Sequence, residues 1–139
     1  MKRIAMYLLV FPFLFGCGGL AIKEKIIGNY YFIAVDVGED CALYYDEGGN
    51  VHGEVIGATV FAVGYNADYM VIKQHPKSFG NPLDKTITNY YILPLKSGMD
   101  WRSKNDLIGP FTKIIFDEKC KELKIPESLL FTRIIEDLE

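Results

Sequence analysis

Cys17 is the residue whose position most clearly indicates a chemical reaction. It follows Leu14-Phe15-Gly16, and the four residues have the pattern of a lipobox, where an exported chain is cut and acylated. Lys2 and Arg3 supply a positive start, and residues 4–15 form an apolar run. That run has the length of an export signal and is too short to span a membrane as a helix.

We therefore expect residues 1–16 to be a lipoprotein signal peptide and Cys17 to become the acylated N-terminus. Two acyl chains, such as palmitate, are enough for stable anchoring to a bilayer. The alternative is a buried N-terminal helix or an uncleaved anchor, and Pro12 argues against a core helix because it removes a backbone donor. The expected location is the extracytoplasmic side of the cell membrane, with the choice between inner and outer membrane left open. Residues 17–27 are expected to be the lipidated cysteine and a flexible tether, and residues 28–139 a single globular domain.

Cys41 and Cys120 are the two thiols that remain if Cys17 is acylated. Outside the cytoplasm one expectation is a disulfide between them. The other is a pair of free thiols that are buried as small apolar side chains. The sequence contains no CxxC, no HExxH and no Cys/His cluster, so we expect no metal site and no cofactor.

His75 is the ionisable residue best placed for catalysis, because it stands at the end of a predicted strand. With Asp84 or Asp68 it could act as a general base in a small cell-envelope hydrolase. Convergence of His75, Asp84 and Trp101 on one cleft would favour this hypothesis. The sequence favours the other interpretation, a structural histidine, and His52 beside a glycine-rich turn is a weaker candidate still. No Gly-x-Ser-x-Gly motif is present to supply a nucleophile.

Aromatic residues are abundant, and tyrosines occur as neighbours in three predicted strands. These doublets are Tyr30-Tyr31, Tyr44-Tyr45 and Tyr90-Tyr91. Because neighbours on a strand point to opposite faces, one tyrosine of each doublet is expected to face outward or to cover an edge. Exposed tyrosines can bind a protein or a glycan, and cross-strand packing is the equally favoured alternative.

The charge of the chain is mildly acidic, at −3. Residues 1–16 carry two positive charges and no acid, so the chain from Cys17 onward carries −5. Without a basic stripe, this balance argues against nucleic acid as a partner. Five acidic residues cluster around two glycine-containing turns, where solvated carboxylates are favoured over a calcium site. They are Asp36, Glu39, Asp40, Asp46 and Glu47.

The pattern of apolar residues predicts an α+β fold, mainly an antiparallel β-sheet of about six to seven strands, with one C-terminal helix packed on it and a final short strand. Strands are expected at residues 26–35, 41–45, 51–57, 59–65, 69–74, 89–95 and 129–135. Thr112 is expected to cap a helix that runs to about Lys124, although residues 113–116 would also suit a short strand. Residues 75–85 and 96–110 are expected to be loops.

Several short segments resemble a family of small uncharacterised bacterial lipoproteins with a domain of unknown function. The resemblance lies in residues 68–76, in Asn89-Tyr90-Tyr91-Ile92, in residues 108–112 and in residues 121–129. It implies location and fold type, and it carries no catalytic residue that can be transferred to this chain.

Together these observations predict a membrane-anchored, non-catalytic binding or interaction module. Its expected partners are the membrane, through lipid on Cys17, and an envelope protein or glycan. A hydrolase that uses His75 is the alternative.

Overall fold

The computed structural model describes residues 22–49, 51–78, 80–95, 106–129 and 131–139. The predicted signal peptide, the acylation site at Cys17 and the tryptophan at position 101 lie outside these residues.

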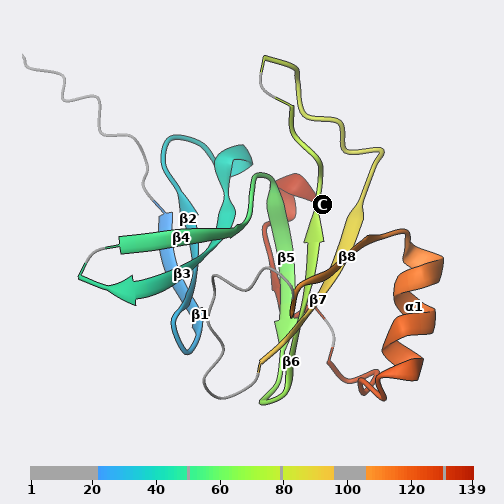
Figure 1. Ribbon diagram of the computed structural model, residues 1–139. Helices are drawn as coiled ribbons and strands as arrows, with labels where there is room; N and C mark the ends of the chain where they lie inside the picture. Colours follow the sequence, from blue (N-terminus) through green and yellow to red (C-terminus); the bar gives the residue numbers. More distant parts are fainter. Residues whose placement is uncertain (1–21, 50, 79, 96–105, 130) are drawn as a thin grey trace, which may run out of the picture.

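The N-terminal half forms a four-stranded antiparallel sheet with the strand order β1-β2-β3-β4 (Figure 1). Its strands are β1 (Ile22–Ile27), β2 (Tyr30–Ala34), β3 (Ala42–Gly48) and β4 (Val51–Ile56), with the short 3-10 helix η1 (Gly38–Asp40) between β2 and β3. The chain reverses between β1 and β2 at Gly28, whose φ of +56° lies in the left-handed region. This turn divides the segment predicted as one strand, residues 26–35, into two paired strands.

The second sheet has five antiparallel strands in the order β8-β7-β6-β5-β9. They are β5 (Val60–Tyr65), β6 (Tyr69–Gln74), β7 (Asn89–Pro94), β8 (Ile108–Phe111) and β9 (Arg133–Ile134), and the 3-10 helix η3 (Glu136–Leu138) follows. The predicted hairpin of β5 and β6 is confirmed. Its turn is held by the Asn66 Oδ1 atom, which accepts hydrogen bonds from the backbone N–H groups of Asp68 and Tyr69 at 2.8 Å each.

The second sheet is the middle layer of three, between the first sheet and the helix α1 (Lys113–Glu122) (Figure 1). Alternate residues of β6 serve the two interfaces: Met70 and Ile72 pack against the first sheet, and Val71 packs toward α1. This position explains why β6 is apolar on both faces.

The helix α1 confirms the expected helix and excludes the short strand considered for residues 113–116. Thr112 is its N-cap residue, without a side-chain cap hydrogen bond, and Phe116 is buried against the second sheet. The helix ends at Glu122. Lys124, which follows the C-cap residue Leu123, has a φ of +55° and precedes Pro126 by two residues.

The α+β class is confirmed, but the number and grouping of the strands differ from the prediction. In the described residues, sheets of four and five strands pack together. The two additional strands are β1, most of which was expected to be tether, and β8, most of which was expected to be loop. The segment Ile22–Ile27 pairs with β2 along its length, so it belongs to the folded domain and is not part of a flexible tether. The last predicted strand, residues 129–135, is reduced to the two residues of β9.

Candidate functional site

His75 lies at the end of β6 and is almost fully buried, with 2% of its surface exposed. Its ring stacks on Phe61 with a centroid distance of 4.1 Å. Nδ1 lies 2.8 Å from the carbonyl oxygen of Ile87, and Nε2 lies 2.8 Å from that of Leu138. Both ring nitrogens face backbone carbonyl oxygens, and the ring is shielded from solvent. A substrate therefore cannot reach either nitrogen to give it a proton.

The two acids proposed as partners of His75 are not hydrogen-bonded to it. Asp68 precedes β6 and His75 follows it, so the strand separates them by about 20 Å. Asp84 lies close enough to sense the charge of His75, but its carboxylate accepts hydrogen bonds from the hydroxyl and the backbone N–H of Thr86. These bonds are the main reason that the pKa of Asp84 is lowered. The contacts of His75 are therefore those of a structural histidine.

His52 belongs to a polar cluster on the face of the first sheet that points away from the core. Its Nε2 accepts a hydrogen bond from Lys23 Nζ at 3.2 Å, although Lys23 is on β1 and His52 on β4, the two edge strands. The Lys23 ammonium also lies 5.3 Å from the ring centroid of Tyr31. On the other side of the ring, Nδ1 faces Asp46 at 4.0 Å, which is too far for a hydrogen bond.

The tyrosine doublets follow the expected alternation. Tyr30 points into the core and Tyr31 away from it, while Tyr45 meets Tyr30 edge-to-face at 5.0 Å. Tyr44 pairs with Tyr31 across the strands on the outer face. The doublet Tyr90-Tyr91 differs because its strand has α1 on one side and the first sheet on the other, so both rings pack inside the protein.

Cys41 and Cys120 are free thiols that lie in different parts of the core. Cys41 is buried between the two sheets, and Cys120 is half-buried on α1 against the other face of the second sheet. Burial raises the pKa of both thiols, that of Cys41 to about 12.

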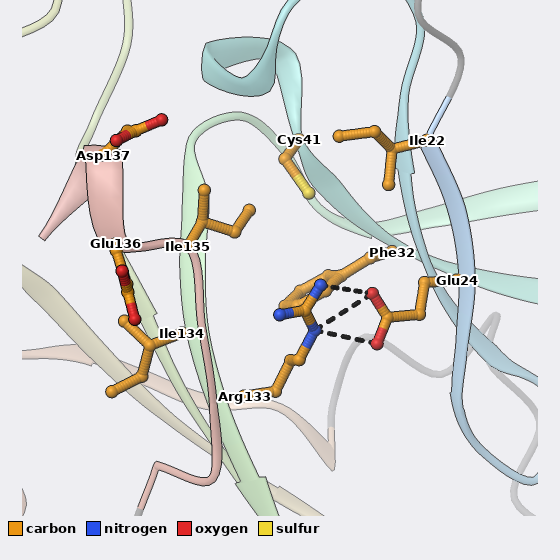
Figure 2. A pocket seen from close by; sticks show the side chains of 9 residues that line it. All are labelled: Ile22, Glu24, Phe32, Cys41, Arg133, Ile134, Ile135, Glu136 and Asp137. Carbon is orange, nitrogen blue, oxygen red and sulfur yellow. Dashed lines mark hydrogen bonds and ion pairs between the residues drawn. The ribbon is translucent and has the colours of Figure 1, made fainter.

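A cavity of about 320 Å³ lies beside Cys41, where the first sheet meets the C-terminal segment (Figure 2). Arg133 on β9 reaches across it to Glu24 on β1, and Arg133 Nη2 and Glu24 Oε2 are 2.6 Å apart. Arg133 Nε donates to both oxygens of the same carboxylate, so the pair is bidentate. Since the Cys41 thiol is protonated at neutral pH, it does not supply this cavity with a reactive nucleophile. The ion pair between Arg133 and Glu24 links the two sheets.

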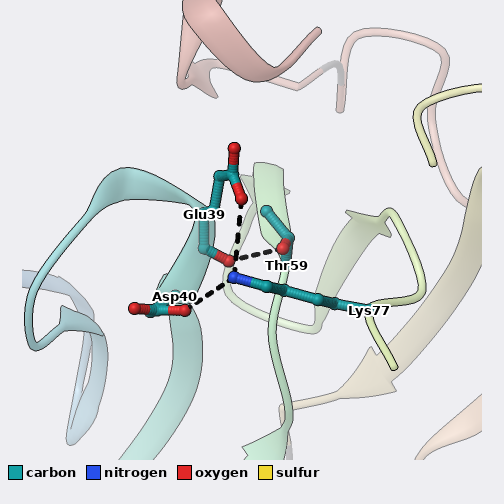
Figure 3. A network of polar contacts seen from close by, with 4 residues as sticks. All are labelled: Glu39, Asp40, Thr59 and Lys77. Atoms are coloured by element: carbon teal, nitrogen blue, oxygen red, sulfur yellow. Dashed lines mark hydrogen bonds and ion pairs between the residues drawn. The ribbon is translucent and has the colours of Figure 1, made fainter. Parts of the chain in front are cut away.

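A second polar network joins two loops at the end of the sheets where β2 and β6 finish (Figure 3). The Lys77 ammonium lies 2.8 Å from Asp40 Oδ1 and 3.5 Å from Glu39 Oε2. Thr59 donates its hydroxyl to the Glu39 carbonyl oxygen. Two of the turn acids therefore bind a lysine and hold η1 in place, which is a structural role.

A groove of about 540 Å³ lies between α1 and the second sheet. We call it the α1 groove. Its floor is apolar and is contributed by the sheet, the helix and the segment that follows the helix. The floor residues are Val71, Phe116, Ile125, Leu129 and Phe131. Both the volume and the apolar floor are typical of sites for small ligands.

Charged side chains line the rim of the α1 groove. They are Lys73, Lys113, Lys121, Asp117 and Glu127. Lys113 is bound to Asp117, with Nζ 2.6 Å from each carboxylate oxygen. Lys73 Nζ lies 4.5 Å from the ring centroid of Phe131 and 3.5 Å from Glu139 Oε1.

Sequence reasoning did not find the α1 groove. The available local signal is the spacing of Phe116 and Cys120, which lie four residues apart and therefore share one face of α1. The contributions of Lys73 from β6 and Phe131 from the C-terminal segment depend on tertiary packing, which no local pattern reports.

Replacing Cys41 by alanine is expected to weaken the dependence of stability on alkaline pH. The thiol titrates near pH 9.0 when it is free and near pH 12 in the fold, so above pH 9.0 the unfolded chain releases a proton that the folded chain keeps. Unfolding is therefore favoured as the pH rises through this window. Urea unfolding at neutral pH and at about pH 10 should show a smaller loss of stability for Cys41→Ala than for the parent. Equal losses would contradict the prediction.

Within the part of the chain that the structure describes, no helix has the length and apolar composition of a membrane span. The described residues also place no three His, Cys, Asp or Glu side chains together as metal ligands.

The comparisons with known proteins give a family and no function. The family described as "Protein of unknown function (DUF3997)" matches residues 27–136, which is most of the chain. No curated protein matches the chain, and no solved structure matches it. The predicted resemblance to a domain of unknown function is confirmed, while its lipoprotein part stays a prediction. The chain therefore belongs to the family of proteins of unknown function designated DUF3997.

Proposed function

We propose that this protein is a lipid-anchored, extracytoplasmic binding module that holds a ligand in the α1 groove and has no catalytic role of its own. The observation that carries the proposal is the groove itself, an apolar floor with a charged rim and a volume of about 540 Å³. Its large apolar floor can supply binding energy, and the few polar groups at the rim can orient a ligand.

The environment of His75 supports a binding role over the alternative hydrolase. A general base must be able to reach the proton that it removes. Both ring nitrogens of His75 instead face backbone carbonyl oxygens inside the protein. The N-terminal sequence supports the anchor, because Cys17 follows a charged start and an apolar run of signal-peptide length.

The anchor is tested by growing cells that express the protein with an alkyne-labelled palmitate. We expect the label in the membrane-bound protein and its loss in the variant Cys17→Ala. Mass spectrometry of the native protein that shows an intact Met1 and an unmodified Cys17 would contradict the anchor.

Ligand binding is tested with a photo-crosslinking amino acid at position 127 on the groove rim. A matched position is 25, which is exposed on β1 and belongs to the other sheet. We expect illumination of intact cells to give an adduct of defined mass at position 127 and not at position 25. The adduct should also be lost in the rim variant Lys121→Glu. Identical adducts at both positions, or none at position 127, would argue against the groove as a binding site.

A further inference from the structure

The capacity of the α1 groove limits the size of its ligand. A volume of about 540 Å³ holds about 18 heavy atoms, if each occupies about the 30 Å³ that a water molecule takes in the liquid. This number of heavy atoms is that of a fatty acid with sixteen carbons.

The floor of the groove suits a hydrocarbon chain. Val71, Phe116, Ile125 and Leu129 are each less than a tenth exposed, so they are a preformed apolar surface and not mobile surface side chains. The ring of Phe131 lies 6.2 Å from that of Phe116 and extends the same surface. Covering this floor removes apolar area from water, which favours binding in proportion to the area covered.

The rim of the groove favours an anion at one end of that chain. The protein as a whole is acidic, with a charge of −3, yet three lysines and two acids line the groove. One of the acids, Asp117, is neutralised by the bidentate contact with Lys113. Lys73 extends its ammonium over the Phe131 ring at the apolar floor and also contacts Glu139, so Lys121 is the rim lysine without a carboxylate partner among the described residues.

Lys121 is the rim cation best placed to serve a ligand. Among the residues that the structure describes, it has neither an ion pair nor a side-chain hydrogen bond, whereas Lys73 and Lys113 each contact a carboxylate. A carboxylate head group can pair with Lys121 without displacing an existing partner, and Lys73 is a second cation of the same lining, with Glu139 Oε1 3.5 Å from its ammonium.

We propose that the α1 groove binds a single-chain anionic amphiphile of fatty-acid type. The hydrocarbon chain lies on the floor between α1 and β6, and the carboxylate is held by Lys121 and Lys73. This inference rests on the proposed function and names the ligand class of the same site.

The native thiol at Cys120 gives a direct measure of occupancy, because it lines the groove and is half-buried there. Cys41 is an internal reference, since it is fully buried away from the groove. The full-length protein, held in phosphatidylcholine nanodiscs, is treated with iodoacetamide, and alkylation at each cysteine is followed by peptide mass spectrometry. Palmitate, hexadecanol and hexadecyltrimethylammonium are added in turn, because they share a chain length and differ in the charge of the head group.

We expect palmitate to slow the alkylation of Cys120 several-fold, and the neutral and cationic compounds to protect it only at higher concentration. Lys121→Ala should raise the palmitate concentration needed for half protection by about fivefold, the effect of one exposed ion pair. Lys119→Ala is the matched control on the same helix. It removes one positive charge that pairs with Glu122 and does not line the groove, so half protection should be unchanged.

Three results would overturn the inference. Equal protection by the three compounds would mean that the groove recognises a chain without regard to charge. Equal effects of Lys121→Ala and Lys119→Ala would mean that Lys121 does not contact the head group. No protection by palmitate would exclude this ligand class, while a protein cross-linked at position 127 would then leave the proposed binding function in place.

Discussion

Replacing His75 by alanine is expected to lower the free energy of unfolding by about 3–5 kcal/mol. The imidazole fills space beside Phe61, and its removal leaves a cavity in the core. It also removes both ring nitrogens, which lie 2.8 Å from the carbonyl oxygens of Ile87 and Leu138, so at least one buried carbonyl loses its hydrogen-bond donor. An unpaired buried carbonyl retains its desolvation cost, so both effects act in the same direction.

The measurement is urea unfolding of His75→Ala beside His52→Ala. His52 is a good control because it is the other histidine of the chain, is partly exposed, and lies on the outer face of the first sheet. Its replacement is expected to cost less than about 1 kcal/mol, since it removes one side-chain hydrogen bond with Lys23 and a ring contact with Tyr31 on a partly exposed face. Similar losses for the two variants would show that the contacts of His75 contribute no special stability.

Replacing Gly109 by alanine is expected to destabilise the protein by about 2–5 kcal/mol. Its φ of +130° is a backbone conformation that residues with a side chain rarely adopt. A Cβ atom at this position would also lie 2.7 Å from the Tyr90 carbonyl oxygen and 2.8 Å from Tyr91 Cδ1. The strand β8 would have to move away from β7, which would weaken the edge of the second sheet next to α1.

Gly38→Ala is the matched control for this substitution. A Cβ atom at Gly38 would have no atom within 4 Å, and Gly38 is not in the positive φ region. We expect its unfolding midpoint in urea to stay near that of the parent protein. If Gly109→Ala unfolds at the same urea concentration as Gly38→Ala, the close approach of β8 to β7 does not limit the choice of residue at this position.

The elements that were predicted well are those whose signal is local. The hairpin of β5 and β6 has an asparagine in its turn between two apolar runs, and α1 has apolar residues at helical spacing between Thr112 and Pro126. Each signal lies within a short window of the chain, so the sequence was sufficient to predict it.

The misread elements depend on partners that are distant in the chain. The segment Ile22–Ile27 has three consecutive charged residues between isoleucines, which suits a tether as well as an edge strand. Its pairing with β2 shows that it is a strand. The division into two sheets has the same origin. Val60 N–H donates to the Cys41 carbonyl oxygen at 2.7 Å where the sheets meet, and no local sequence pattern predicts this contact.

The candidate chemistry shows the same limit. His75 was identified as the notable histidine, but its role depends on Leu138, whose carbonyl oxygen is contributed from the far end of the sequence. The α1 groove likewise needs Lys73 and Phe131 to meet the helix. Sites of this kind are assembled by packing, so sequence alone can nominate their residues but not place them together.

The C-terminal residues 133–139 contact parts of the protein that the ribosome synthesises much earlier. Arg133 binds Glu24, the carbonyl oxygen of Asp137 accepts a hydrogen bond from Lys85, and that of Leu138 lies 2.8 Å from His75 Nε2. A nascent chain emerges from the ribosome with its N-terminus first, so the hairpins can form during synthesis before these three contacts exist. The domain can therefore complete its packing only after residues 133–139 have been synthesised, and a product terminated before residue 133 would expose the Cys41 region and leave His75 without its contact to Leu138.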